Sequence, residues 1–158
     1  AIEMAEELQV EAVTVDSIDE CLETSDVLVT CTPSTSPLIE PENIPDGLFI
    51  AAVGADSPEK QELDVRILAQ AKVVVDLIDQ CKNVGELHHG IKAGVISEEE
   101  VHAELGQVII GTRTGRTSDE EVIVFDATGS ALQDTAGAIA VYERAVSSKH
   151  GNNFNFFS

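Results

Sequence analysis

The sequence has few basic and few aromatic residues. Its 158 residues contain 9 Lys and Arg against 29 Asp and Glu, a formal net charge of −20, with no Trp and one Tyr. Nucleic acids and anionic membrane surfaces repel a field of this sign, so neither is an expected partner. The acidic excess fits either an ordinary solvated surface or a protein from a salt-rich cytoplasm, where screening relaxes repulsion between like charges.

Cysteine and long apolar runs are also scarce. The three cysteines, an odd number without a CxxC spacing, are expected to be reduced thiols in a cytosolic protein. No apolar stretch approaches the length of a membrane span, and the acidic N-terminal stretch lacks the regions of a signal peptide. No carboxylate or thiol accompanies the histidines at a zinc-site spacing, so no metal is expected. The cysteines are Cys21, Cys31 and Cys81, and the histidines considered as metal ligands are His88, His89 and His102.

Apolar residues are abundant enough for a core, at 43% of the chain. The runs at 26–31, 49–53 and 73–75 lack alternation, which is typical of parallel strands covered on both faces. Between the last two, apolar residues at helical spacing predict a helix over 62–71. Strand, helix and strand in this order indicate a doubly wound α/β fold.

Shorter patterns predict the remaining elements. Ser17 with Glu20, and Ser97 with Glu100, have the spacing of capping boxes that begin helices. A final long helix carries small residues that would allow close packing on a partner element or subunit. The predicted elements are helices over 2–8, 18–23, 97–105 and 130–147, and strands over 12–15 and 122–126.

Three loops that follow predicted strands carry the residues best suited to chemistry. They are Thr30–Ser34, Val53–Ser57 and Asp126–Gly129, and ligands of open parallel sheets bind at such strand ends. Each loop could equally be an ordinary turn, because Thr, Ser, Gly and Pro are common turn formers. Three on one sheet edge favour a binding crevice. No glycine-rich phosphate loop is present, so the residues alone leave the ligand open.

The order and wording of these segments resemble the ornithine cyclodeaminase and mu-crystallin family, which includes archaeal alanine dehydrogenases. The resemblance covers nearly the whole chain. It implies an NAD cofactor, a small amino-acid substrate and a homodimer. The segments that carry it are Ser25–Ser34, Ala52–Asp56, Glu62–Asp64, Gly85–Leu87, Gly115–Glu121, Phe125–Gly129, Leu132–Asp134 and Tyr142–Ala145.

The resemblance also implies a domain organisation. The fold class would be α/β, a Rossmann-like doubly wound parallel sheet whose first strand–helix–strand unit is missing, followed by a long C-terminal helix. Residues 1–129 would be a partial NAD-binding domain. Residues 130–158 would be a helix and tail that return to a dimerisation and substrate domain absent from this chain. Such a fragment, without the phosphate loop, would be inactive alone.

One residue matches the family's catalytic carboxylate. Asp56 would exchange a proton with the substrate amine or the attacking water, because oxidation of an amine to an imine releases a proton. An Asp after a strand is otherwise most often a cap or a turn residue.

The resemblance assigns further positions to the cofactor and the substrate. Lys60 would act through its charge, although a surface ion pair with Glu59 or Glu62 is the plain alternative. Ala127 stands where many members have Ser, so a hydroxyl contact to the cofactor is lost there. Thr128 matches a position near the substrate. The positions expected to contact NAD are Thr32, Val53, Gly54, Ala55, Lys60 and Ala127.

The predicted activity of the full-length protein is NAD-dependent oxidative deamination of a small L-amino acid through an imine, as in alanine dehydrogenase. Segment 53–64 resembles that branch most. One alternative is an ornithine cyclodeaminase that converts L-ornithine to L-proline and ammonia. Another is a non-catalytic mu-crystallin-like binding protein or an inactive fragment. Asp56 favours catalysis, because crystallin-type members differ there.

Overall fold

The computed structural model describes residues 2–152 and residue 154, so most of the predicted apolar tail, 155–158, lies outside the described residues. The chain divides into two compact units, Ala1–Thr128 and Gly129–Ser158. The first is an α/β unit around a five-stranded sheet, and the second contains one long helix.

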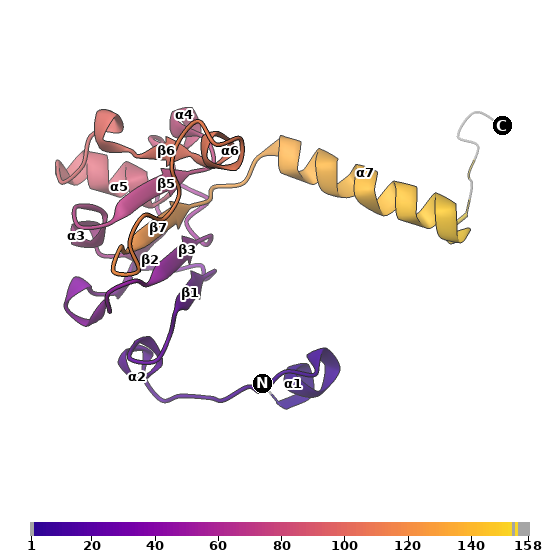
Figure 1. Cartoon of the computed structure of the whole chain (residues 1–158), viewed down its shortest axis with the longest axis horizontal. Coiled ribbons are helices and arrows are strands. Elements are labelled where there is room, and N and C mark those ends of the chain that lie inside the picture. Colours follow the sequence, from indigo (N-terminus) through magenta and orange to yellow (C-terminus); the bar gives the residue numbers. More distant parts are fainter. Residues whose placement is uncertain (1, 153, 155–158) are drawn as a thin grey trace. The chain divides into compact units, whose positions relative to one another are not determined.

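The main sheet has the strand order β1-β3-β7-β5-β6 (Figure 1), and each of its pairings is parallel. The register sets Thr30 beside Ala52, and Ala52 beside Asp126, so β1, β3 and β7 end level with one another. This confirms the predicted parallel α/β fold. The strands are β1 Val27–Thr30, β3 Phe49–Ala52, β5 Lys72–Val75, β6 Ala103–Glu104 and β7 Ile123–Asp126.

A second, two-stranded parallel sheet joins β2 (Thr35–Ile39) to β4 (Gln61–Leu63). The predicted helix over 62–71 is therefore wrong in its first part. Asp64 separates strand from helix, because its side chain accepts a hydrogen bond from the Arg66 amide (2.8 Å) and caps α3 (Val65–Leu68). Pairing with β2 thus overrides the helical spacing of the apolar residues.

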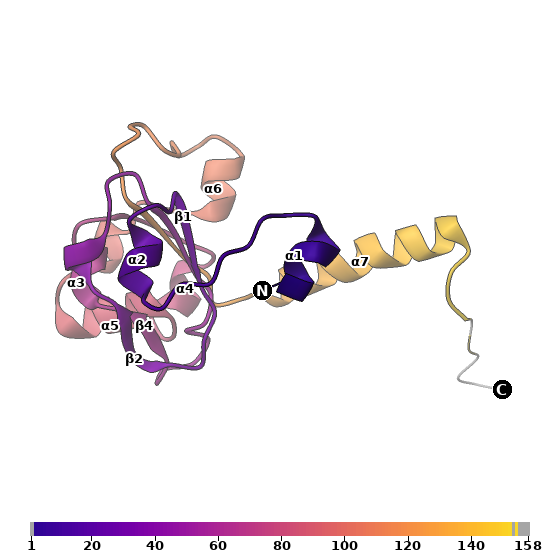
Figure 2. The same cartoon turned by 90° about the horizontal axis from the view of Figure 1, so that it is seen from below.

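The core lies between one face of the main sheet and helices α3 and α5 (Glu86–Ala93). Figure 2 shows these two helices side by side. Helix α5 ends at Gly94, which has the left-handed φ of 71° that a glycine C-cap requires. The side chains that pack here are almost fully buried. They include Ile50, Val73, Val75 and Val124 of the sheet and Ile67, Leu68 and Leu87 of the helices.

The opposite face of the sheet is covered less completely. Helix α6 (Leu105–Ile109) lies over it, and an apolar groove of about 410 Å³ remains between that helix and Phe49, Val74 and Phe125. Near the edge, Val27 and Val29 of β1 are each 58% exposed. Helices thus lie on both faces, as a doubly wound fold requires, but they cover the two faces unequally.

Two of the shorter predictions were wrong. The segment 12–15 forms no strand, and its Val13 side chain is 77% exposed. Ser97 and Glu100 do form the predicted capping box, but it begins only the single 3-10 turn η2 (Glu98–Glu100), because the chain then pairs Ala103 with β5. The other short elements are α1 (Ile2–Leu8), α2 (Ile18–Leu22), η1 (Pro41–Asn43) and α4 (Ile78–Cys81).

The second unit consists mainly of α7 (Ala131–Ser148), close to the predicted range. Ser130 caps it in a capping box with Gln133. Several of its apolar side chains are more than half exposed, among them Leu132, Ile139, Tyr142 and Val146. Among the described helices, including this one, none combines the length and the apolar character needed to cross a bilayer.

Candidate functional site

The three loops singled out from the sequence meet at one edge of the main sheet. Backbone hydrogen bonds join them, since the Val53 amide donates to the Thr30 carbonyl (2.8 Å) and the Ala127 amide to the Ala52 carbonyl (2.9 Å). The structure therefore brings together the ends of β1, β3 and β7, where ligands of open parallel sheets bind.

The loop after β3 presents some of its predicted residues to solvent and hides others. Val53 is 44% exposed, and Asp56 is also exposed. Gly54 and Ala55 are buried, so any contact they make with a ligand stays a prediction. Thr32, on the neighbouring loop after β1, is exposed. The exposed side chains at this edge thus include an apolar one, a hydroxyl and a carboxylate, those of Val53, Thr32 and Asp56.

Asp56 forms an ion pair with Lys60, whose Nζ lies 2.6 Å from Oδ1. The hydrogen bond and the charge of Lys60 lower the pKa of Asp56 below its ordinary value of 3.8. The alternative partners expected for Lys60, Glu59 and Glu62, are therefore wrong. An exposed carboxylate that stays ionised over a wide pH range is able to accept a proton.

Glu62 is the main feature of the site that sequence reasoning missed. Its side chain is fully buried, and its two carboxylate oxygens accept hydrogen bonds from the Thr32 amide (2.6 Å) and the Gly54 amide (3.0 Å). We call this pair of hydrogen bonds the Glu62 bridge. It joins the loop after β1 to the loop after β3. The available signal was an acidic residue at the start of a segment that we predicted to be helical.

A second buried carboxylate supports the first. The Glu86 oxygens accept hydrogen bonds from the backbone amides of Glu62 (2.7 Å) and Leu63 (3.2 Å), which fixes β4 against the start of α5. Burial raises the pKa of Glu86 to about 8.

A third buried carboxylate ends β7. Asp126 Oδ2 accepts the Leu87 amide (2.8 Å), and burial raises the pKa of Asp126 to about 7. Its Oδ1 is buried and has no hydrogen-bond partner among the residues that the structure describes. It lies against Gly85, where a Cβ would approach it to 2.7 Å at a φ of +88°. Only glycine fits there without strain. The ends of β7, α5, β4 and the two loops are therefore connected through Asp126, Glu86 and Glu62.

Thr128, expected near the substrate, is 9% exposed and already hydrogen-bonded. Its hydroxyl donates to the Asp76 carboxylate (3.1 Å) and accepts from Gln80 Nε2 (2.8 Å). The thiol of Cys81 donates to the same Asp76 oxygen (3.0 Å), and burial raises the pKa of this thiol. These contacts favour a role for Thr128 in holding the loop after β7.

His88, His89 and His102 each lie within hydrogen-bond distance of a backbone carbonyl. His89 Nε2 lies 2.8 Å from the Lys60 oxygen, and His102 Nε2 lies 2.8 Å from the Thr114 oxygen. Within the part of the chain that the structure describes, no three His, Cys, Asp or Glu side chains gather as a metal site requires. Cys21, Cys31 and Cys81 are free thiols.

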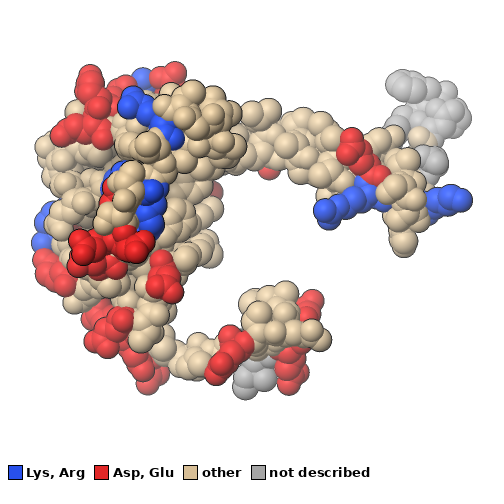
Figure 3. All heavy atoms as spheres, viewed as in Figure 1, with Lys and Arg blue, Asp and Glu red and all other residues tan. Residues whose placement is uncertain are grey.

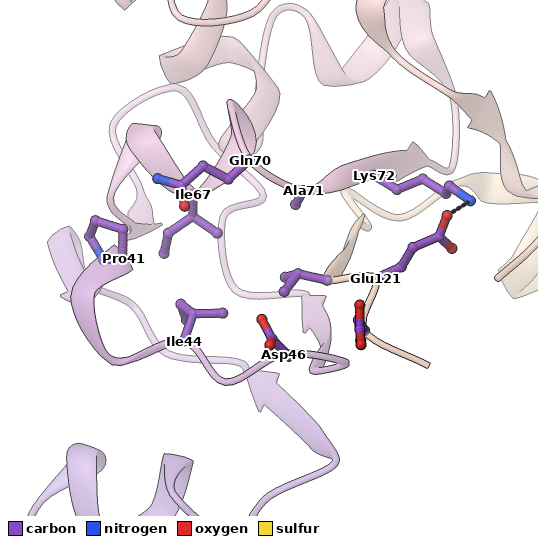
Figure 4. Close-up of a pocket in the computed structure, with 10 residues that line it drawn as sticks. Pro41, Ile44, Asp46, Ile67, Gln70, Ala71, Lys72 and Glu121 are labelled. Atoms are coloured by element: carbon purple, nitrogen blue, oxygen red, sulfur yellow. Dashed lines mark hydrogen bonds and ion pairs between the residues drawn. The ribbon is translucent and has the colours of Figure 1, made fainter. Parts of the chain in front are cut away.

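Two cavities lie near opposite ends of the strands of the main sheet. One of about 330 Å³ is lined by Thr30 and Thr32 together with residues of α2 and β2. The other, of about 440 Å³, lies where β5 and β7 begin and includes no predicted site residue (Figure 4). There the Lys72 ammonium is engaged with Glu121 (2.7 Å) and the Gly115 carbonyl (3.0 Å). We place the candidate site at the carboxyl edge, where the loops converge.

The surface charge agrees with the composition. On the face shown in Figure 3, Asp and Glu side chains gather over the α/β unit, and Lys and Arg are fewer. Lys60 is one of the few basic residues of the chain, and at the candidate site its ammonium pairs with the Asp56 carboxylate in the loop after β3.

A twisted parallel sheet with helices on both faces, and with small, polar loops at its carboxyl edge, defines a Rossmann-like α/β domain. The chain belongs to the ornithine cyclodeaminase/mu-crystallin family, whose profile matches residues 1–149. This confirms the resemblance found in the sequence.

Two named relatives illustrate the similarity in sequence. Alanine dehydrogenase of Archaeoglobus fulgidus is 52% identical over 132 residues, which cover 84% of this chain and 41% of the relative. Iminosuccinate reductase of Paracoccus denitrificans is 46% identical over 121 residues, which cover 77% of this chain and 37% of the relative. The chain thus spans less than half the length of the curated relatives it matches.

Solved structures give the same result. An archaeal alanine dehydrogenase dimer with bound NAD superimposes with a TM-score of 0.88 at 46% identity, covering 99% of this chain and 48% of that one. The Delta(1)-pyrroline-2-carboxylate reductase of Thermococcus litoralis, in complex with NADH and L-proline, gives a TM-score of 0.92 at 33% identity, covering 98% and 48%.

Proposed function

We propose that the protein containing this chain is an NAD-dependent enzyme that interconverts an amine and an imine beside the carboxylate of a small amino acid. The names of its relatives, an alanine dehydrogenase, an iminosuccinate reductase and a pyrroline-carboxylate reductase, have that chemistry in common. The observation that carries the proposal is the exposed Asp56 carboxylate, which Lys60 keeps ionised at the carboxyl edge of the sheet.

The residues at this edge fit part of a dinucleotide. The Thr30 hydroxyl is buried and has no hydrogen-bond partner among the described residues, and other atoms of Thr30 line the cavity that Thr32 also lines. An orphaned polar atom beside a cavity is the kind of group that a bound polar ligand satisfies. The exposed Val53 offers an apolar surface of the kind that ligand rings contact. We propose that Thr32, Val53 and Lys60 hold the cofactor, with the backbone near Gly54, Ala55 and Ala127.

The chain's own contribution to the reaction is proton handling. When bound, NAD would exchange hydride with the substrate α-carbon. Oxidation of the amine leaves a proton, which the ionised Asp56 carboxylate would accept, and in a deaminase the same carboxylate would orient the water that hydrolyses the imine. Lys60 keeps the carboxylate ionised in the free protein and, by lowering its pKa, also makes it a weaker base than an unpaired Asp.

We propose L-alanine as the first substrate to test, because the alanine dehydrogenase relative is 52% identical. Ornithine cyclodeaminase is the alternative activity, since the crystal structure of the probable ornithine cyclodeaminase from Bordetella pertussis has the same fold at 26% identity. A non-catalytic binding protein is less favoured, because Asp56 and its Lys60 partner are both in place. We also propose a homodimer in the cytoplasm, and the alanine dehydrogenase structure is that of a dimer.

The test is an assay of the purified native protein with NAD and either L-alanine or L-ornithine. Formation of NADH and ammonia from alanine supports a dehydrogenase, whereas ammonia and proline from ornithine without net NADH support a cyclodeaminase. The variant Asp56→Asn is expected to lower kcat by roughly 10²- to 10⁴-fold. Asp46→Asn, an exposed Asp in the loop before β3, serves as the matched control and should leave kcat unchanged. Full activity of Asp56→Asn would refute the assignment.

A further inference from the structure

The loops that carry the proposed cofactor residues are joined by a fully buried side chain, that of Glu62. Thr32 and Gly54 belong to different strand ends, and the carboxylate of Glu62 accepts the backbone amide of each, at 2.6 and 3.0 Å. Asp56 follows Gly54 by two residues. The Gly54–Asp56 stretch is tightened further, because the Asp56 amide donates to the Gly54 carbonyl (3.0 Å).

We propose that Glu62 is a positioning residue, whose bridge between the loops after β1 and β3 sets the places of Thr32, Val53 and Asp56 for cofactor binding and proton transfer. This inference rests on the proposed function. Glu62 itself is fully buried beneath the loops, so it would act only through the backbone that it holds.

The chemistry of the bridge requires a carboxylate. Two amide donors converge on it, and an ionised carboxylate is the side chain that accepts on both oxygens, with hydrogen bonds stronger than those to a neutral group. Among the described residues, no Lys or Arg forms an ion pair with Glu62. Burying a carboxyl group is costly unless hydrogen bonds compensate, and the two loop amides supply those hydrogen bonds. The bridge is thus maintained against a desolvation penalty.

Two neighbouring features fit this arrangement. A Cβ at Gly54 would collide with the Glu62 carboxylate, so the glycine leaves the room that the bridge occupies. From the other side, Glu86 accepts the Glu62 amide (2.7 Å) and fixes the backbone from which the bridge extends. The backbone of Glu62 is therefore fixed by Glu86, and its carboxylate contacts the loop after β3 at Gly54.

The test compares two Glu→Gln variants of the native protein. In Glu62→Gln, one loop amide faces an NH₂ group instead of an oxygen, so one hydrogen bond is lost and two donors oppose each other. We expect the NADH dissociation constant to rise at least tenfold, kcat to fall, and the Thr32 and Gly54 amides to exchange hydrogen faster.

Glu121→Gln is the matched control. The Glu121 carboxylate also bridges two groups, the Thr117 amide (2.8 Å) and Lys72 Nζ (2.7 Å), but it does so just before β7 begins, at the other end of the sheet. This variant should lose stability and yet keep the NADH dissociation constant within twofold. A merely structural role for Glu62 would make the two variants behave alike.

The outcomes separate the bridge from the proposed function. A folded Glu62→Gln protein that binds NADH within twofold of the unmodified protein overturns the inference. Equal weakening by Glu121→Gln also overturns it. If the unmodified protein binds no NADH, the proposed function fails on that result alone. Amide exchange then decides on the bridge: faster exchange at Thr32 and Gly54 in Glu62→Gln supports it, and unchanged exchange overturns it.

Discussion

Raising the pH from about 5 to 8 is expected to destabilise the fold, because two buried carboxyl groups must give up protons that they retain in the folded state. The pKa of Glu86 is raised from 4.5 to about 8, and that of Asp126 from 3.8 to about 7. Between the ordinary and the raised values the folded chain binds more protons than the unfolded chain. The free energy of unfolding therefore falls as pH rises through this window, by about 1.4 kcal/mol per pH unit for each group.

Near pH 6 both groups contribute, and together they are expected to add a slope of about −2 to −3 kcal/mol per pH unit. The lowered groups act in a different window. The pKa values of Asp64 and Glu121 are held at about 2 by Arg66 and Lys72, so their stabilisation is complete above their ordinary values and is lost only as pH falls towards 2. They leave the slope between pH 5 and 8 unaffected.

Urea unfolding across this pH range, in the unmodified protein and in Glu86→Gln, measures the effect. Glutamine cannot ionise, so the variant should lose roughly half of the slope near pH 6. At pH 5 it should be less stable by about 1–3 kcal/mol, because one of the Glu62 and Leu63 amides loses its acceptor. Surface carboxylates and histidines are the same in both proteins and cancel in the difference. Identical slopes would refute the assignment of raised pKa values to these buried groups.

Two further predictions concern the catalytic carboxylate and the core. Lys60→Met should raise the pKa of Asp56 towards 3.8, so the low-pH limb of the kcat/KM profile moves to higher pH; an unmoved limb would contradict the ion pair seen here. Leu87→Ala, at a fully buried position of α5, should lower the free energy of unfolding by about 2–5 kcal/mol in urea titrations. A loss under about 1 kcal/mol would show that α5 does not pack as described.

The main strands of the sheet were predictable because most of their residues are apolar, and the sequence shows this directly as apolar runs without alternation. The strand ends and the candidate loops followed from those runs. Asp56 was assigned through the family resemblance, since an Asp after a strand is more often a cap than a catalyst. Helix α7 was predicted within about a residue at each end, because Leu132, Ala136, Ile139 and Tyr142 recur at helical spacing along it.

The contacts that organise the site could not be predicted, because they join segments far apart in the chain. Glu62 lies in β4 only because β2 pairs with it, and its two partners are 30 and 8 residues away. The hydroxyl of Thr128 is engaged by Asp76, 52 residues before it. Local periodicity carries no information on such pairs. The same limit explains why the helix predicted over 62–71 was wrong in its first part.

The contact between Gly54 and Glu62 also constrains how this domain can change over time. The three atoms nearest to a Cβ at Gly54 all belong to the Glu62 carboxyl group, so the two positions depend on each other. A mutation that gives residue 54 a side chain is harmful while a glutamate occupies position 62, and it becomes tolerable only after that acid has been shortened or lost. Such epistasis fixes the order of substitutions. A lineage that abandons the bridge must give up the acid first.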